Sequence, residues 1–172
     1  MKLKSLLLSI AGCIAFAPAS FAERGSDGNV SIIYWQAPSI LNPYLTGGTK
    51  DLESSSMVIE PLGRYDNTGA LVPYLAKEIP TVGNGGVSAD LMSITWALKD
   101  GLLWSDGTAV TSEDVKFSAD YCLHPDMGCA SLSYFAGVTS VDVVDALTVK
   151  VNFDSPKPNP YGPYMGYTTP II

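Results

Sequence analysis

The sequence predicts an α/β fold, and three patterns along the chain support that prediction. Residues 93–98 alternate polar and apolar side chains, and residues 140–153 do so on both sides of an Asp-Ala turn. Such alternation is typical of strands with one buried face. Between these segments, Thr111-Ser112-Glu113-Asp114 has the form of a helix N-terminus, and apolar residues follow at helical spacing to about Cys122. We therefore expect a capped helix between a strand and a hairpin.

Shorter signals predict the remaining elements. They indicate a buried strand at Val30–Trp35, a helix at Asp51–Leu62, a hairpin turn at Arg64–Gly69 and a short returning strand at Leu102–Trp104. Residues 71–79 contain Pro73 and indicate a short helix or an irregular packed segment. Repeated prolines after residue 153 make regular structure unexpected there.

Composition places the chain among globular proteins. Its 172 residues are 47% hydrophobic and 16% charged, which suits one domain, or one domain and part of another. The net charge is −7, and Lys and Arg form no cluster anywhere along the sequence. Because binding to nucleic acid requires a basic surface, no nucleic-acid partner is expected.

The first 22 residues have the form of a signal peptide. Lys2 and Lys4 precede an apolar run at residues 6–16, and Ser20-Phe21-Ala22 places small residues where a signal peptidase cuts. We predict cleavage before Glu23 and a soluble protein in the periplasm. The apolar run is too short to remain in a membrane as a spanning helix.

A lipid anchor is the alternative. Ile10-Ala11-Gly12-Cys13 resembles the cleavage box of lipoproteins, and acylation of Cys13 would tether the protein to a membrane. Cys13 comes early, however, and the residues directly after it are still apolar. The soluble exported form is therefore favoured.

Cys122 and Cys129 are the cysteines that remain after cleavage, and they bracket a turn-rich loop. Export implies oxidising conditions, so a local disulfide between them is the favoured interpretation. A loop this short predicts a modest stabilisation of about 2 kcal/mol. The alternative is a metal site that adds His124 to the two thiols, but the spacing matches no compact zinc motif. No metal is expected.

Catalytic motifs are not found in the sequence. It contains no nucleophile elbow, phosphate loop, dinucleotide fingerprint or metalloprotease helix, and its one histidine is His124. Asp100 and Asp106 are explained as turn residues, and Glu113 and Asp114 as residues of a helix cap. We expect neither enzymatic activity nor a cofactor.

Several motifs in a fixed order resemble one protein family. Residues 98–118, LKDGLLWSDGTAVTSEDVKFS, resemble the signature of the extracytoplasmic solute-binding proteins that serve peptide/nickel-type ABC importers (family 5). Further matching segments are Leu41-Asn42-Pro43, Ile59-Glu60-Pro61-Leu62, Val72-Pro73-Tyr74-Leu75-Ala76, Val141-Asp142-Val143 and Thr148-Val149-Lys150-Val151. The resemblance covers nearly all of residues 30–172.

The resemblance implies a periplasmic-binding-protein-like fold of the large type, a two-lobed α/β clamshell with an extra α/β subdomain. Members of the family are about three times as long, so the chain corresponds to the N-terminal third. The implied organisation is a signal peptide at 1–22, the start of lobe I at 23–48, the extra subdomain at 49–158, and a Pro/Tyr-rich return toward lobe I at 159–172. The stretch Leu103–Phe117 then has an architectural role.

The resemblance also implies a binding surface. The end of the first strand and the loop after Leu-Asn-Pro face the cleft in relatives, and an aromatic residue after the helix of the extra subdomain can reach the ligand. The corresponding residues are Tyr34, Trp35, Thr46, Gly48, Thr49, Asp51 and Tyr134. The implied partners are a small peptide or similar solute and the membrane permease of an ABC transporter, with the binding protein itself a monomer. A secreted hydrolase, and a sensing or chaperone-like protein of the same fold, remain the alternatives.

Overall fold

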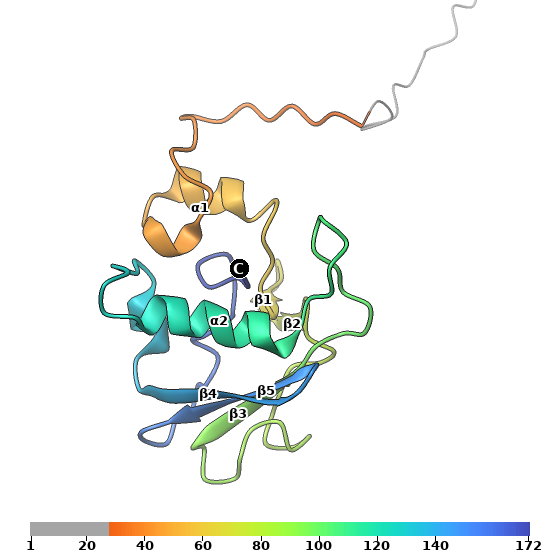
Figure 1. The fold of residues 1–172 in the computed structure, drawn as a ribbon, viewed down its shortest axis with the longest axis vertical. Helices are drawn as coiled ribbons and strands as arrows, with labels where there is room; N and C mark the ends of the chain where they lie inside the picture. Colours follow the sequence, from red (N-terminus) through yellow and green to blue (C-terminus); the bar gives the residue numbers. More distant parts are fainter. Residues whose placement is uncertain (1–27) are drawn as a thin grey trace, which may run out of the picture. The chain divides into compact units, whose positions relative to one another are not determined.

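The computed structural model describes residues 28–172 of the chain (Figure 1). Contacts divide the polypeptide between Ile33 and Tyr34. The described part of the first unit, residues 28–33, contains neither helix nor strand. All helices and strands described below belong to the second unit.

A three-stranded antiparallel sheet lies at one side of the second unit. Its strand order is β3 (Ser93–Ala97), β5 (Thr148–Phe153) and β4 (Val138–Asp145). Ile94, Val151 and Val141 lie opposite one another across the three strands, and all are buried. This confirms the strand expected at 93–98 and the hairpin expected at 140–153.

Helix α2 (Ser112–Leu123) packs on this sheet, against β4 and β5 (Figure 1). At its start the Thr111 amide donates to Asp114 Oδ2 at 2.7 Å, as the capping sequence predicts. Val115, Ala119 and Cys122 form its buried face. The predicted capped helix is therefore confirmed, including its apolar stripe.

The core lies between α2 and the sheet and extends to the end of the chain. Trp96, Phe135 and Tyr164 are fully buried in it, and the rings of Phe135 and Tyr164 meet edge to face with centroids 5.8 Å apart. The Tyr164 hydroxyl donates to the carbonyl of Val115 at 2.8 Å. Residues 154–172 form no helix or strand, as expected, yet they supply part of the core through Tyr164 and Ile171.

A second, smaller sheet is a hairpin of β1 (Gly63–Tyr65) and β2 (Leu71–Pro73). The Asp66 carboxylate organises its turn by accepting hydrogen bonds from the amides of Thr68 at 2.8 Å and Ala70 at 3.0 Å. The predicted turn is confirmed. The helix or irregular segment predicted for residues 71–79 is wrong for residues 71–73, because these form the strand β2. Pro73 is tolerated because β2 is paired on one side only.

Helix α1 (Thr49–Ser55) is shorter than the predicted helix at 51–62 and begins two residues earlier. Its last residues are serines whose hydroxyls donate to backbone carbonyls of the preceding turn, as Ser55 does to Asp51 at 2.8 Å. Serines of this kind do not favour continuation of a helix. Met57 and Val58, which the prediction placed inside the helix, are exposed in the turn that follows.

The predicted buried strand at residues 30–35 is wrong. These residues form no strand, and none of the strands that the structure describes pairs with them. Ile33 is fully exposed and the Trp35 side chain is 69% exposed. β-Branched composition alone does not form a strand without a partner for its backbone groups.

The predicted strand at 102–104 is also wrong in extent. Residues 103–109 form a tight corner in which Leu103 and Ala109 make one isolated antiparallel bridge. The Asp106 carboxylate closes the corner by accepting from the Thr108 amide at 2.9 Å and from its hydroxyl at 2.7 Å. These hydrogen bonds from the Thr108 hydroxyl and amide lower the pKa of Asp106 below its ordinary value. Trp104 is half-buried at this corner.

Candidate functional site

The loop that leads into α1 is organised around Asp51, which is 4% exposed. Its carboxylate accepts hydrogen bonds from the Ser39 amide at 2.6 Å, the Thr46 hydroxyl at 2.9 Å and Lys50 Nζ at 3.1 Å. The hydrogen bond from the Ser39 amide, aided by those from Lys50 and Thr46, lowers the pKa of Asp51 to about 2. Since both oxygens are occupied by the chain, Asp51 joins residues 39–46 to α1. A direct ligand contact by Asp51 stays a prediction.

The neighbouring candidates Thr46, Gly48 and Thr49 belong to the same loop. Thr46 is half-buried, and its hydroxyl also accepts from the Gly48 amide at 3.0 Å. Gly48 is the N-cap of α1, and a Cβ there would lie 3.2 Å from Asp51 Oδ2. Thr49 is the first residue of the helix and is exposed. The structure thus brings four predicted residues together, with Thr49 facing solvent.

Tyr34 and Trp35 form an exposed aromatic pair beside α1. Their ring centroids are 5.9 Å apart, and the side chains are 37% and 69% exposed. The Tyr34 hydroxyl donates to the carboxylate of Glu53 on α1, and this hydrogen bond raises the pKa of Tyr34. The phenol of Tyr167 adds a smaller electrostatic contribution that also raises the pKa of Tyr34. The pair is therefore available for contact with a ligand.

A pocket of about 260 Å³ continues the surface beyond Tyr167. We call it the tyrosine pocket; its lining residues are Ser56, Pro61, Arg64, Tyr65, Tyr74, Gly166 and Tyr167. The Arg64 guanidinium lies 4.2 Å from the centroid of the Tyr74 ring. None of these residues was singled out as a site residue from the sequence. Residues 56–74 and residues 166–167 are far apart in the sequence, so the sequence alone does not show that they line one pocket.

Tyr134 lies on a short 3₁₀-helix, η2 (Leu132–Phe135), and is 45% exposed. It lines a hollow of about 290 Å³ together with Tyr65, Asn159, Tyr161, Gly162 and Met165. Tyr65 lines both this hollow and the tyrosine pocket, so the two are neighbours. Tyr134 is thereby linked to the tyrosine pocket through Tyr65.

Five exposed aromatic side chains lie beside α1 and around these two hollows, and we call them the aromatic face. Its members are the exposed side chains Tyr34, Trp35, Tyr65, Tyr134 and Tyr167. Aromatic side chains provide large contact areas at low conformational cost and are typical of binding surfaces. Three of its members, Tyr34, Trp35 and Tyr134, were predicted from the sequence. No signal in the sequence separates Tyr167 from Tyr164, because both lie between Pro163 and Pro170 and only Tyr164 is buried.

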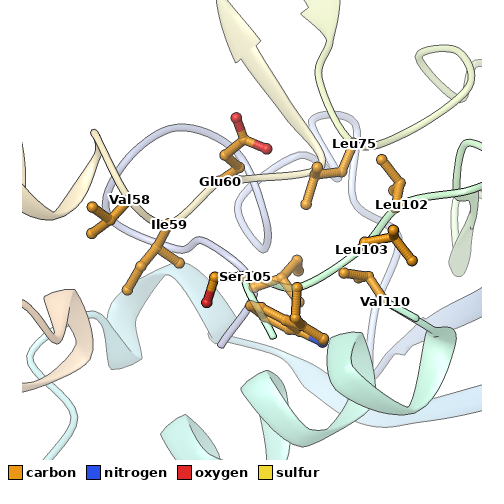
Figure 2. Close-up of a pocket in the computed structure, with 10 residues that line it drawn as sticks. Val58, Ile59, Glu60, Leu75, Leu102, Leu103, Ser105 and Val110 are labelled. Atoms are coloured by element: carbon orange, nitrogen blue, oxygen red, sulfur yellow. The ribbon is translucent and has the colours of Figure 1, made fainter. Parts of the chain in front are cut away.

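A separate cavity of about 150 Å³ lies beside the corner at residues 103–109 (Figure 2). Leu102, Leu103 and Val110 line one side of it, and Val58 and Ile59 line the other (Figure 2). Glu60 and Ser105 add the polar side chains. None of the predicted site residues reaches this cavity.

The two cysteines form the predicted disulfide. Cys122 and Cys129 are bonded, with their Cα atoms 5.0 Å apart. Within residues 28–172, no cluster of three or more His, Cys, Asp or Glu side chains is arranged to hold a metal ion. Over the same residues, no helix combines the length and apolar character needed to cross a membrane.

Comparison with protein families identifies the chain. Residues 70–172 match the model of the bacterial extracellular solute-binding proteins, family 5 Middle. This match covers more than half of the sequence. The chain belongs to this family. A family 5 solute-binding protein is an exported protein, which agrees with the leader expected from the sequence.

Individual relatives agree with the assignment. A probable ABC transporter-binding protein of Deinococcus radiodurans is 28% identical over 116 residues, which are 66% of this chain and 18% of the relative. The Haemophilus influenzae OppA structure, a complex with the peptide RPPGFSPFR, superposes with a TM-score of 0.70 at 21% identity over 79% of this chain and 29% of OppA. NikA of Brucella suis in complex with Fe(III)-EDTA gives 0.59 at 28% identity over 70% of this chain and 23% of NikA.

These superpositions show that the chain has the α/β fold of periplasmic binding proteins, as predicted. The chain spans less than a third of the length of each of these three relatives. The matched part includes the sheet of β3, β4 and β5 and the helix α2, since both lie within residues 70–172.

Proposed function

We propose that this protein is the extracytoplasmic substrate-binding component of an ABC importer. It captures a small peptide or a similar solute and delivers it to the permease subunits in the membrane. The observation that carries the proposal is the aromatic face, a group of five exposed aromatic side chains on a family 5 scaffold. Two relatives are described as complexes, OppA with a peptide and NikA with a metal chelate.

The aromatic face would form one wall of the binding cleft. Its aromatic rings would pack on the apolar parts of the solute, and the second wall would come from the other lobe of a clamshell. A ligand that contacts both lobes favours the closed state, and the permease would recognise that state. In this arrangement residues 23–48 begin lobe I, residues 49–158 form the extra subdomain, and residues 159–172 return toward lobe I.

The proposed location is the periplasm, as a soluble monomer without a lipid anchor. The signal peptide at 1–22 and the alternative anchor at Cys13 lie outside the residues that the structure describes. Membership of a solute-binding family favours binding over hydrolysis. A sensing or chaperone-like role would use the same surface without a permease, and deletion of the permease genes would separate the two.

Titration of the full-length mature protein with an equimolar pool of di- to pentapeptides tests the proposal. The protein is first unfolded and refolded to remove any bound solute. We expect micromolar or tighter binding by isothermal titration. Trp35→Ala should weaken it about tenfold, because removing a well-placed aromatic contact commonly costs more than 1 kcal/mol.

The matched control is Phe117→Ala. Phe117 is 54% exposed on α2 and lies outside the aromatic face, so its removal should leave the affinity unchanged. Equal weakening by both substitutions, or no binding of any peptide at millimolar concentration, would contradict the proposed function.

A further inference from the structure

We propose that Arg64 and Tyr74 form an anion site in the tyrosine pocket, which binds a carboxylate group of the solute. The inference rests on the proposed function and specifies the chemistry of the ligand. It assigns a role to a cation that neither the fold nor the core requires.

The position of Arg64 is fixed by the small hairpin. Arg64 is the middle residue of β1 and pairs with Val72 of β2, while Tyr74 follows the end of β2. This register places the guanidinium 4.2 Å from the centroid of the Tyr74 ring. A cation–π contact of this kind holds the guanidinium group in place while its N–H groups remain open to a ligand.

Arg64 has no anionic partner among residues 28–172. The ion pairs of the described chain are Lys50–Asp51, Lys77–Asp100 and Lys116–Asp120. The nearest acid in sequence, Asp66, accepts hydrogen bonds from Thr68 and Ala70 at Oδ1 and forms no ion pair with Arg64. The guanidinium of Arg64 therefore keeps its charge uncompensated by a neighbouring carboxylate, on the wall of the tyrosine pocket.

The lining of the tyrosine pocket defines the class of ligand. A guanidinium offers parallel N–H donors that match the two oxygens of a carboxylate. Tyr65 and Tyr167 add aromatic surface at the sides of the pocket, and Ser56 adds a hydroxyl. A volume of about 260 Å³ suits a single terminal residue, so the preferred ligand is a peptide with a free carboxyl end.

The test compares two equimolar tripeptide pools, one of free acids and one of C-terminal amides, on the refolded full-length protein. The wild type should bind the acid pool about tenfold more tightly, because a charge-assisted bidentate contact is lost in the amides. Arg64→Gln should bind both pools with the affinity of the amide pool. Raising the salt from about 0.05 to 0.5 M should reduce the acid preference, since the site is open to solvent.

Matched variants separate the anion site from general effects of charge and folding. Lys116→Gln removes an equal charge from α2 and should leave the acid preference intact. Tyr74→Phe keeps the ring beneath the guanidinium and should keep the preference, whereas Tyr74→Leu should reduce it. Superimposable thermal melts would show that each variant is folded.

Two outcomes overturn the anion site alone: equal affinity for the acid and amide pools, or an acid preference that survives in Arg64→Gln. Both leave the proposed function standing, because peptide is still bound. Failure of the wild type to bind either pool overturns the anion site together with the proposed function.

Discussion

At the scale of single residues, side chains predicted to contact a ligand divide into two groups. Tyr34, Trp35 and Tyr134 are exposed, whereas Asp51 is buried under hydrogen bonds from its own chain. The sequence predicted the position of this loop but not the burial of Asp51. Its partner Ser39 lies twelve residues away, and no local pattern indicates that contact.

The hydrogen bonds to the Asp51 carboxylate predict a specific acid sensitivity. Its pKa is lowered from 3.8 to about 2 in the folded protein, so the charged form favours folding. That contribution is present above pH 4 and is lost as the pH falls toward 2. Asp51→Asn should lower the unfolding temperature at pH 6 and flatten its dependence on pH between 4 and 2.

Thermal melts followed by circular dichroism provide the measurement. Asp126→Asn, in the exposed loop between the cysteines, is the matched control and should leave the melting curve unchanged. A variant at Asp51 that melts with the wild type at pH 6 would show that its hydrogen bonds do not stabilise the fold.

Tyr65 and Tyr167 were not predicted as site residues, and the physical reason is the same for both. Tyr65 ends a short strand and Tyr167 lies among turns, where no repeat of two or 3.6 residues shows which side chains face outward. Ile94, Trp96 and Leu98 were predicted because the alternation in their strand separates a buried face from a wet one.

At the scale of elements, the structure depends on how α2 ends. The Cys122–Cys129 disulfide closes the loop after the helix, and the Ala130 amide directly beyond it donates to the Tyr44 carbonyl at 2.7 Å. The disulfide therefore positions a segment that reaches the core through Tyr44.

Loss of the disulfide should destabilise the fold by about 2 kcal/mol, the value expected for a short loop. Chemical denaturation of the double variant Cys122→Ser/Cys129→Ser, compared with the wild type, measures this difference. A reducing agent should lower the stability of the wild type and leave the double variant unchanged. Mass spectrometry that finds two free thiols in the exported protein would contradict the prediction.

Helices and strands were predictable where the repeat of apolar residues and the cap or turn residues at both ends lie within the segment itself. The capped helix α2 and the hairpin of β4 and β5 meet this condition, since each carries its own turn or cap residues. The segment at residues 30–35 does not meet it, because a strand exists only with a partner and no local residue specifies one.

At the scale of the whole molecule, binding should require more than the described surface. The side chains of the aromatic face are exposed, and the two hollows beside them have volumes of about 260 and 290 Å³. A ligand held from one side leaves much of its surface in water. We expect residues 23–172 alone to bind the peptide pool at least about 100-fold more weakly than the full-length protein.

Isothermal titration of both proteins provides the comparison, with circular dichroism to verify that residues 23–172 are folded. Micromolar binding by residues 23–172 alone would show that one wall is sufficient and would argue against a two-lobed cleft.

The irregular end of the chain limits where this protein can be cut. The Leu62 amide donates to the Tyr164 carbonyl at 3.0 Å, and the Ile172 amide donates to the Ser118 hydroxyl at 2.9 Å. A truncation placed after β5, where regular structure ends, would remove the buried side chains of Tyr164 and Ile171. The part of the core that these side chains cover beneath α2 would then be exposed to solvent. Shortened versions of this protein must therefore retain the proline- and tyrosine-rich stretch, although it resembles a dispensable linker.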